Sequence, residues 1–577
     1  MHVAKIERKH GGRTYISYLL RQSYREGGKV KHRTLANLSH LPQQQIDLLR
    51  RSLQGETFVA GEEAVRTQAS KPHGHVEAVL VAFEQLDLCG LLASRPSRQR
   101  SVVLALIAQR LLFPCSKLAS RRYWQTTTLA EELEVADANT AELYQALDWL
   151  LARQPQIEQR LAKRHLREGG CVLYDVSSSY YEGRKCPLAR YGHDRDGKKG
   201  LPIVVYGVLT DKDGRPVAVD VYPGNTGDST TVPSQIAKIR EKFSLTRVIL
   251  VGDRGMLTQT QIDTLQQYPG LGWISALRSE AIGKLLEKGL LKRQSFQDAQ
   301  LAEITSPDFP GERLIACYNA FLAKERQEKR QRLLQATETD LKRLQQEVQR
   351  RTVKLLSAAQ IGLKAGKVIF RHKMAKHFQL QIADGSFSFG RDEEAIKQEE
   401  ELDGIYVIRT SEKADDLQAA QCVRTYKSLA VVERAFRCLK GLDLLVRPIR
   451  HRIEPRVRAH VLLCLLAYYV EWHMRKALKP LLYEDEELEE LRRSRDPVKP
   501  AQASESAKAK KKTHQTKEGE IVHDFRSLLA HLGTRSRVTY QLGAAENLAT
   551  FQQLSQPDFT QAEALRLLRL LTLSPES

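Results

Sequence analysis

Apolar residues change their spacing at several points along the chain, and each change predicts a different kind of secondary structure. Between about residues 44 and 168 they recur every three or four positions, as in "VEAVLVAFEQLDLCGLL" and "RSVVLALIAQRLL", which predicts a series of helices. From residue 171, short β-rich runs bounded by Gly, Asp and Pro predict strands instead. The predicted strands cover 171–181, 202–211, 215–224, 247–253 and 272–277, with a helix near 258–268. This succession predicts a mixed α/β sheet.

Residues 279–400 interrupt the strand-rich pattern. A long helical stretch is predicted at roughly 321–360, followed by the strand-like pieces "KVIFRH" and "HFQLQIADGSFSFG". The α/β pattern resumes with a strand at 403–412 and a helix from about residue 426. The interrupting segment is therefore interpreted as an insertion into the sheet.

Four apolar residues in the long helical stretch are spaced by seven: Leu334, Leu341, Val348 and Leu355. Heptad spacing is typical of paired helices, which can lie within one domain or in two subunits. Packing within the same domain is at least as good an interpretation as pairing between subunits.

We predict a multidomain α/β protein. Its expected segments are a basic β-hairpin module (1–45), a helical domain (46–168), the first part of the sheet (169–278), the insertion (279–400), the second part of the sheet with a long helix (401–480), a flexible charged linker (481–519) and a C-terminal module (520–577). Basic residues on the helical domain favour contact with DNA, although a plain helical bundle has a similar pattern.

Charge narrows the range of functions. The chain of 577 residues has 90 Lys and Arg against 69 Asp and Glu, a formal net charge of +21. Such an excess attracts polyanions, among which nucleic acid is the commonest in a cell, although a basic surface alone would have the same composition.

Other features of the sequence argue against several classes of protein. The eight cysteines have no CxxC spacing, so neither a zinc ribbon nor a dithiol redox site is indicated. The N-terminus lacks the apolar region of a signal peptide, and the run "VLLCLLAYYV" is half the length of a membrane span. We expect that run to be a core helix and the protein to be cytoplasmic, without a membrane partner.

Carboxylates stand where strands are expected to end. In "VILVGDRGM" an apolar strand is followed by Asp253, and "CVLYDVSSS" places Asp175 in the same way. In "YKSLAVVERAFRCLKGL", Tyr426, Leu429, Glu433, Phe436 and Lys440 are spaced by three and four, which predicts one helical face with a glutamate in its middle.

Three converging carboxylates would form an oxygen-only site suited to Mg²⁺ or Mn²⁺. Buried charges are costly unless they are paired or bind a metal. Each residue also has an ordinary interpretation, because aspartates after strands commonly form turns and helical glutamates commonly lie on the surface.

These segments, in this order, resemble an insertion-sequence transposase of the DDE superfamily. Within that superfamily, the chain resembles most specifically the subgroup that has a Tyr-x2-Arg-x3-Glu-x6-Lys signature. It rests on "YDVSSSYYEG", "VGDRGM", "DGIYVIRTSE" and the helix from Tyr426, and on a Gly-Asn-x-x-Asp element at Gly224, Asn225 and Asp228. It covers roughly residues 170–280 and 400–475.

One position departs from the signature. Its arginine is replaced by Leu429, which cannot bind a phosphate. We expect that Lys427, Arg434 or Arg437 supplies the charge, or that the site functions without it. The spacing of Tyr426 and Lys440 still assigns the third acid to Glu433.

The resemblance implies an RNase H-like core split by the insertion domain and preceded by the basic hairpin and helical regions. Asp175, Asp253 and Glu433 would be catalytic and would hold two Mg²⁺ or Mn²⁺ ions, with Asn225 and Asp228 as supporting residues. Tyr426, Lys440 and Arg254 would contact DNA.

The implied partners are the terminal inverted repeats of the element, target DNA and a second copy of the chain in a homodimer. An insertion sequence also implies a bacterial protein that is associated with the nucleoid when bound to DNA. Two alternatives remain: a metal-dependent nuclease on the same fold, and a catalytically silent DNA-binding protein derived from a transposase.

Overall fold

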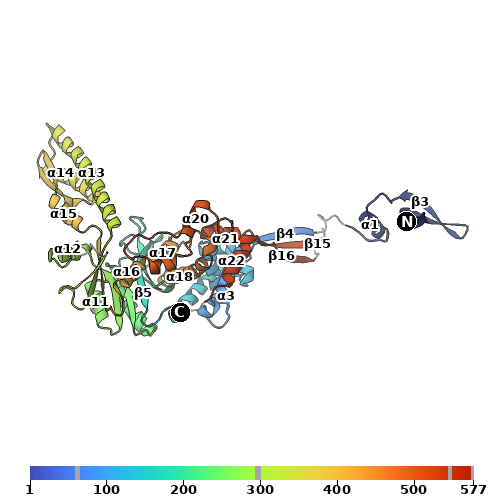
Figure 1. The fold of residues 1–577 in the computed structure, drawn as a ribbon, viewed down its shortest axis with the longest axis horizontal. Coiled ribbons are helices and arrows are strands. Elements are labelled where there is room, and N and C mark those ends of the chain that lie inside the picture. Colours follow the sequence, from blue (N-terminus) through green and yellow to red (C-terminus); the bar gives the residue numbers. More distant parts are fainter. Residues whose placement is uncertain (59–64, 293–295, 297–299, 543–548, 573–577) are drawn as a thin grey trace. The chain divides into compact units, whose positions relative to one another are not determined.

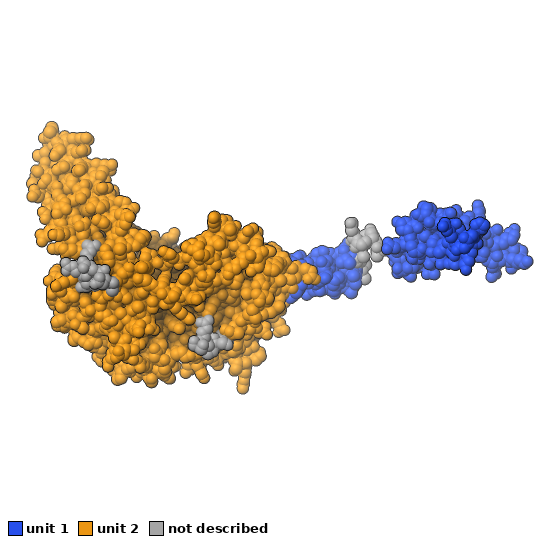
Figure 2. All heavy atoms as spheres, viewed as in Figure 1, with its two compact units in different colours: residues 1–71, 536–555 blue, residues 72–535, 556–577 orange. Residues whose placement is uncertain are grey.

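The computed structural model describes residues 1–58, 65–292, 296, 300–542 and 549–572. It contains two compact units, which are coloured separately in Figure 2. One comprises residues 1–71 and 536–555, and the other comprises residues 72–535 and 556–577. The C-terminal part of the chain therefore contributes to both units.

The smaller unit begins with an antiparallel sheet whose strand order is β1-β2-β3 (Figure 1). Its strands are β1 (His2–His10), β2 (Arg13–Glu26) and β3 (Lys29–Asn37), and they are followed by α1 (Gln43–Leu53). Helix α1 covers one face of the sheet through a small core of Val3, Leu38 and Ile46. The sequence predicts only a hairpin here, and the structure adds β1, which pairs with β2 along its whole length. We call residues 2–53 the N-terminal module.

The other sheet of this unit joins segments that are far apart in the sequence. Strand β4 (Val65–Pro72) pairs with β15 (Ser536–Leu542), which pairs in turn with β16 (Thr550–Leu554). The region after residue 520 is thus tied to the segment that follows the N-terminal module.

An eight-stranded mixed sheet forms the centre of the larger unit, in the order β10-β11-β14-β9-β8-β5-β6-β7. The strands are β5 (Cys171–Tyr180), β6 (Ile203–Asp211), β7 (Pro216–Pro223), β8 (Val248–Val251), β9 (Leu271–Ala276), β10 (Leu301–Ile304), β11 (Arg313–Tyr318) and β14 (Ile405–Thr410). Strands β5, β8 and β9 are parallel, and the other neighbours are antiparallel. This is a mixed sheet of the RNase H-like kind that the resemblance implies.

Helices cover the sheet, which explains why its central strands are apolar along their length. Every residue of β6, "IVVYGVLTD", is buried. Helix α17 (Leu429–Lys440) packs on β5, and α9 (Gln154–His165) and α18 (Glu454–Ala477) pack on β7. The other helices near the sheet are α10 (Val232–Ala237), α11 (Gln259–Gln266), α12 (Ser279–Glu287) and α16 (Ala419–Lys427).

The apolar run in α18 is buried throughout, so it is a core helix, as its length predicts. Within the described part of the chain, no single helix is long and apolar enough to span a membrane. Helices α5 (Arg98–Leu112) and α6 (Lys117–Thr126) meet the same length and hydropathy criteria only together, as a pair bent by 83°.

The helical region before residue 168 shares its core with the sheet. Besides α5, α6 and α9 it contains α3 (Gly74–Gln85), α4 (Leu88–Leu92), α7 (Leu129–Glu132) and α8 (Thr140–Ala152). Helices α5 and α8 pack against α18, and α3 packs against α21 (Phe525–Leu532) and α22 (Phe559–Arg569). One hydrophobic core extends from Val76 to Leu571. The periodicity predicts which helix faces are buried, but it does not predict which elements cover them.

The insertion is smaller than the interrupted pattern suggests. Strands β10 and β11, which lie within residues 279–400, extend the core sheet beyond β14. The residues around these strands share a small hydrophobic core with Ile405 and Val407 of β14, and the part that follows has a hydrophobic core of its own. Its elements are α13 (Ala320–Arg350), α14 (Ala358–His372), β12 (Phe378–Ala383), β13 (Ser386–Arg391) and α15 (Glu393–Glu401).

The heptad residues pack within this insertion core. Leu334, Leu341 and Val348 are buried on α13, whereas Leu355 follows the end of that helix and is exposed. The segment "KVIFRH", predicted as a strand, is the last part of α14. Of its three consecutive apolar residues only Ile369 is buried, on the same helical face as Ile361 and Ala365.

Residues 481–519, which the sequence predicts to be a flexible linker, are folded. They contain α19 (Leu488–Ser494) and α20 (Glu505–Thr513). Lys510 is only 4% exposed and donates to the carbonyl oxygens of Lys479 and Leu482. Ser504 caps α20 and also donates to Asp485. The opposite charges in this segment pair with one another and with backbone groups, so a polar composition is compatible with packing.

Four short helical turns complete the described elements: η1 (Asp228–Thr231), η2 (Lys238–Lys242), η4 (Ala375–His377) and η5 (Lys479–Leu481). The first residue of η2, Lys238, joins a helix to the edge of the sheet. Its ammonium group lies 2.9 Å from the Glu158 carboxylate of α9 and 2.8 Å from the Asp220 carboxylate of β7. The side chains of Lys238 and Glu158 are almost completely buried.

Replacement of Lys238 by Met is expected to destabilise the larger unit by about 3–5 kcal/mol, because it leaves Glu158 and Asp220 without their cation. Urea denaturation followed by tryptophan fluorescence measures the change. Lys212→Met, which removes an exposed lysine from the turn between β6 and β7, is the matched control. Equal stability of the two variants would show that the buried cation is not needed.

Candidate active site

Asp175 lies on β5, and Asp253 follows the end of β8, the parallel neighbour of β5, by two residues. Cys171, Val172 and Leu173 of β5 pair in register with Ile249, Leu250 and Val251 of β8. Asp175 and Asp253 each come two residues after the last of these pairs, Leu173 with Val251. The Asp175 side chain points to the same face as Leu173, because side chains alternate along a strand. Paired strands are about 4.8 Å apart, so adjacent segments of the chain carry the two acids.

Asp175 does not end its strand, contrary to the sequence interpretation. It lies in the middle of β5, opposite Val208 of β6, and the strand continues to Tyr180. The serines after it belong to the predicted strand at 171–181, and Ser178 and Ser179 are fully buried in the sheet. Ser179 satisfies its hydroxyl group with the Tyr206 hydroxyl group, 2.9 Å away.

Asp253 both forms a turn and presents a carboxylate. Strand β8 ends at Val251, and Oδ1 of Asp253 accepts hydrogen bonds from the backbone N–H groups of Gly255 (3.0 Å) and Met256 (2.8 Å). No described residue donates a hydrogen bond to Oδ2, and the side chain is exposed. The turn thus fixes the orientation of the carboxylate and leaves one oxygen for a ligand.

Glu433 reaches the site from α17, which packs on β5. The predicted single helix is two helices, because α16 ends at Lys427 and α17 begins at Leu429. Tyr426 therefore does not share a helix with Glu433. The Glu433 side chain is exposed, and it is not enclosed in an apolar face as the spacing suggested.

Electrostatic coupling shows that these acids are near one another. The pKa of Asp175 is raised to about 7, mainly by burial and in smaller part by the carboxylates of Asp253 and Glu433. A hydrogen bond from the Val176 N–H group and the nearby Arg195 guanidinium oppose this rise. At neutral pH the site therefore holds a carboxyl group that exchanges a proton readily.

Tyr426 completes the group. Burial raises its pKa to about 12, and the nearby charges of Asp253, Asp175 and Glu433 also raise it. Its hydroxyl group is consequently protonated at neutral pH and can donate a hydrogen bond. Leu429, which replaces the signature arginine, is half-buried and packs against the main core.

Two family models match the chain. A transposase DDE domain matches residues 171–470, which include all three acids, and an IS1634 family transposase N-terminal domain matches residues 3–66. The chain belongs to the DDE transposase family. It is therefore an enzyme of DNA phosphoryl transfer, and transposases of this family generally depend on divalent metal ions.

Two solved structures are distantly similar to this transposase. A piggyBac transposase synaptic complex with hairpin DNA has 9% sequence identity and a TM-score of 0.34, over 80% of this chain and 76% of that one. A Mos1 transposase paired-end complex with left transposon end has 14% identity and a TM-score of 0.14, over 43% and 70%. No curated protein matches the chain. Membership of the family rests on the two sequence matches.

A buried carboxylate that the sequence did not reveal joins the two acid-bearing elements of the transposase. Asp196, whose side chain is fully buried, accepts a hydrogen bond from the N–H group of Tyr180 at the end of β5 (3.0 Å). It also contacts Nζ of Lys440 at 3.0 Å and the Arg447 guanidinium at 2.5 Å. Lys440 is the last residue of α17, so Asp196 holds the helix of Glu433 to the strand of Asp175. We call this group the Asp196 clamp.

The other residues expected to contact DNA differ in their surroundings. Lys427 donates to the carbonyl oxygen of Pro497 (2.6 Å), and Arg434 donates to Glu484 (2.6 Å). Arg437 and Arg254 are exposed, and Arg254 is close enough to lower the pKa of Tyr426. Arg254 and Arg437 are thus more accessible to a phosphate than Lys427 or Lys440.

Asp228 of the Gly-Asn-x-x-Asp element holds an arginine near the acids. Both of its carboxylate oxygens lie 2.5 Å from Nη2 of Arg195, whose charge acts on Asp175. Asn225 lies in the loop after β7, next to Gly224. A side chain at Gly224 would collide with the carbonyl oxygens of Ile203 and Arg190, which explains the glycine. The element therefore shapes the loop that positions Arg195.

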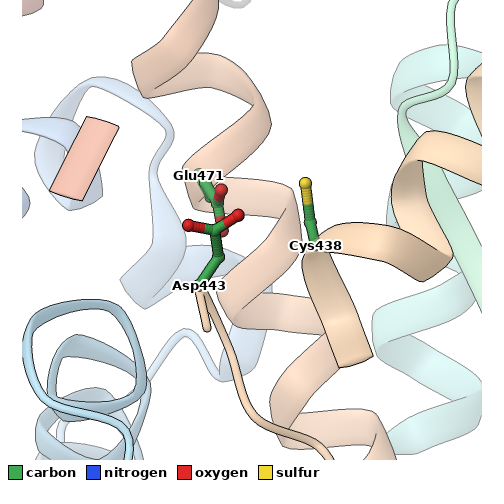
Figure 3. A group of neighbouring side chains, drawn as sticks. All are labelled: Cys438, Asp443 and Glu471. Atoms are coloured by element: carbon green, nitrogen blue, oxygen red, sulfur yellow. The ribbon is translucent and has the colours of Figure 1, made fainter. Parts of the chain in front are cut away.

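Figure 3 shows a second group of potential ligand atoms, in Cys438, Asp443 and Glu471. The ligand atoms of these three side chains all lie within 4.8 Å of one another. Among the described residues, Asp175, Asp253 and Glu433 do not form so close a group. Arg475 lies 2.6 Å from Glu471 and 3.2 Å from Asp443. Burial raises the pKa of Cys438 to about 12, which disfavours a thiolate. The group is best explained as an ion-pair cluster around Arg475.

Replacement of Asp175 by Asn should alter how stability depends on pH in metal-free buffer. The wild-type carboxyl group titrates near pH 7 when folded and near 3.8 when unfolded. The folded state therefore binds more protons between these values, and wild-type stability falls as pH rises, by up to about 1.4 kcal/mol per pH unit. The variant lacks this loss, so it should gain stability relative to wild type between pH 4 and 7.

Urea denaturation at pH 5 and pH 8 with a chelator measures this gain. Asp263→Asn, on the exposed face of α11, is the control and should differ from wild type by the same amount at both pH values. A pH-independent difference for Asp175→Asn would contradict the raised pKa.

Disruption of the Asp196 clamp is expected to lower DNA cleavage about 10- to 100-fold, because misplacing a catalytic group by about 1 Å has effects of that size. Asp196→Asn and Lys440→Met should have similar effects, and the double variant should be little worse than either. Gel-based cleavage assays and DNA-binding titrations provide the measurement. A loss of DNA affinity in Lys440→Met that is absent in Asp196→Asn would instead indicate that Lys440 contacts phosphate.

Proposed function

We propose that this transposase binds the ends of its insertion sequence and catalyses DNA cleavage and strand transfer at Asp175, Asp253 and Glu433. The main support is the parallel pairing of β5 with β8, which brings together the chain segments that carry Asp175 and Asp253, and the packing of the Glu433 helix, α17, on β5. Their mutual influence on the pKa of Asp175 supports one shared site.

The donor set fits divalent metal ions. It consists of carboxylate oxygens, the ligands that Mg²⁺ and Mn²⁺ prefer, and Oδ2 of Asp253 points away from the hydrogen bonds of its turn. Asp175 and Asp253 would hold the ions together with Glu433, and a pair of bound ions would supply positive charge to an in-line phosphoryl displacement. The ions would also offset the mutual repulsion of the carboxylates.

The surrounding residues are suited to a DNA substrate. Arg254 and Arg437 are exposed cations on the elements that carry Asp253 and Glu433, and we assign them to phosphates near the cut. Tyr426 remains a phenol, so it can donate a hydrogen bond to DNA, and no covalent protein–DNA link is assigned to it. Arg195, held by Asp228, would maintain positive charge beside Asp175.

The substrate is proposed to be double-stranded DNA, first the terminal inverted repeats and then the target. Transposition joins two ends, so a homodimer is the expected active species. The net charge of +21 favours such a polyanionic substrate.

Asp253→Asn and Glu433→Gln should each abolish cleavage of a duplex that contains the element terminus, by roughly a thousandfold or more, and leave binding intact. Wild type and variants would be assayed for nicking and strand joining with Mg²⁺, Mn²⁺ or Ca²⁺. Asp263→Asn removes the same charge from an exposed position on α11 and should remain active.

Other results would favour the alternatives. Cutting by the wild type that ignores the terminal sequence would indicate a nuclease. Binding without cutting in any metal would indicate a silent DNA-binding protein, and the three acids would then have no catalytic role.

A further inference from the structure

The sheet of the N-terminal module has two different faces, and the strand register defines them. Val3 of β1 pairs with Leu20 of β2, and both contact the core beneath α1. Because side chains alternate along a strand, the even-numbered residues of β2 point toward α1 and the odd-numbered ones point away. We call the side that points away from α1 the free face. In the described part of the N-terminal module, α1 is the helix that packs on this sheet.

Arginines are concentrated on the free face. Arg13, Arg21 and Arg25 are odd-numbered residues of β2, and Arg8 of β1 pairs with Tyr15, also on this face. The two carboxylates of the sheet strands lie on the opposite side. There Glu7 pairs with Lys5 at 2.7 Å and Glu26 pairs with Lys31 at 2.8 Å. The free face therefore carries positive charge without a carboxylate to neutralise it.

Neutral hydrogen-bonding groups lie between these arginines. Tyr15 is 56% exposed, and the Ser23 hydroxyl group lies 3.0 Å from the ring nitrogen of His32 on the neighbouring strand. A surface of arginine, tyrosine, serine and histidine can contact both phosphates and the edges of bases.

The dimensions of the free face agree with a DNA duplex. The outer strands are two strand spacings apart, about 10 Å, and the major groove is about 12 Å wide. Arg13 and Arg25 are separated by about 40 Å along β2, somewhat more than one helical turn of about 34 Å. The middle strand thus fits the groove, and the outer strands lie near its phosphate walls.

We propose that the free face docks in the major groove of double-stranded DNA, with β2 running along the groove. The inference deepens the proposed function and rests on it for the identity of the DNA, which is the end of the element. Arg21 near the middle of the sheet reads base edges, and Arg13 and Arg25 near the two turns contact phosphates or flanking guanines.

The test compares two charge-matched double variants of the full-length transposase. Arg13→Ala/Arg21→Ala removes two cations from the free face, and Lys9→Ala/Lys29→Ala removes two from the side of α1. Binding to a labelled terminal duplex is measured with a chelator present. The free-face variant should bind about 30-fold or more weakly, and the control less than about 3-fold, since each good base contact contributes about 1–3 kcal/mol.

Two further measurements locate the contact. Methylation of guanine N7, which lies in the major groove, should interfere with wild-type binding, whereas a minor-groove ligand should not compete. Melting temperatures of both double variants should equal that of wild type, because the replaced side chains are exposed or half-buried and lie outside the small core of the module.

Equal losses in the two double variants would overturn the proposal, because binding would then depend only on net charge. So would unchanged binding in both, or a preference for the single strand of the same sequence. The assay involves no cleavage, so a failure of metal-dependent cutting would refute the proposed function and leave this binding result standing.

Discussion

The parallel pairing of β5 with β8 is the constraint on which the site depends. This pairing brings the chain segments of Asp175 and Asp253 together, and burial and the Asp253 carboxylate both make ionisation of Asp175 less favourable. The apolar residues just before them hold the arrangement, because Leu173 and Val251 are fully buried. Sheet pairing thus enforces a local arrangement that electrostatics alone would oppose, and such opposition is common where proteins carry out chemistry.

A second set of charges holds the remaining parts in place. Lys238 joins α9 to β7, and Asp196 joins α17 to β5. These carboxylates and cations lie in the interior, where an unpaired charge is costly, so each pair fixes the positions of the two elements that supply it. Some of the charged side chains of this basic protein therefore stabilise its own fold.

Much of the catalytic sheet could be predicted from the sequence, because strands such as β6 and β8 are short apolar runs between turn residues. The turn at Asp253 was equally visible. Asp175 was interpreted as following the apolar part of the strand predicted at 171–181. Pairing with β6 and the contact of Ser179 with Tyr206 show that Asp175 lies in the middle of that strand.

Features that depend on distant parts of the chain could not be predicted. Nothing near Lys440 indicates that Asp196, more than two hundred residues earlier, binds its side chain. The break between α16 and α17 at Ser428 leaves the apolar spacing intact, so the periodicity of Tyr426 and Glu433 suggested one helix. The segment at 481–519 was misjudged for a related reason, because the partners of Lys510 belong to residues outside its helix.

The sheet of β4, β15 and β16 determines when the protein can finish folding. Strand β4 leaves the ribosome early, but β15, its partner, begins only at Ser536. At about 5–20 residues per second, β4 waits for roughly 25–90 s before its partner is made. Throughout this time the N-terminal module is connected to the growing chain through β4, which has no partner strand yet. A nascent chain can therefore form the sheet of the N-terminal module before β4 has its partner strand.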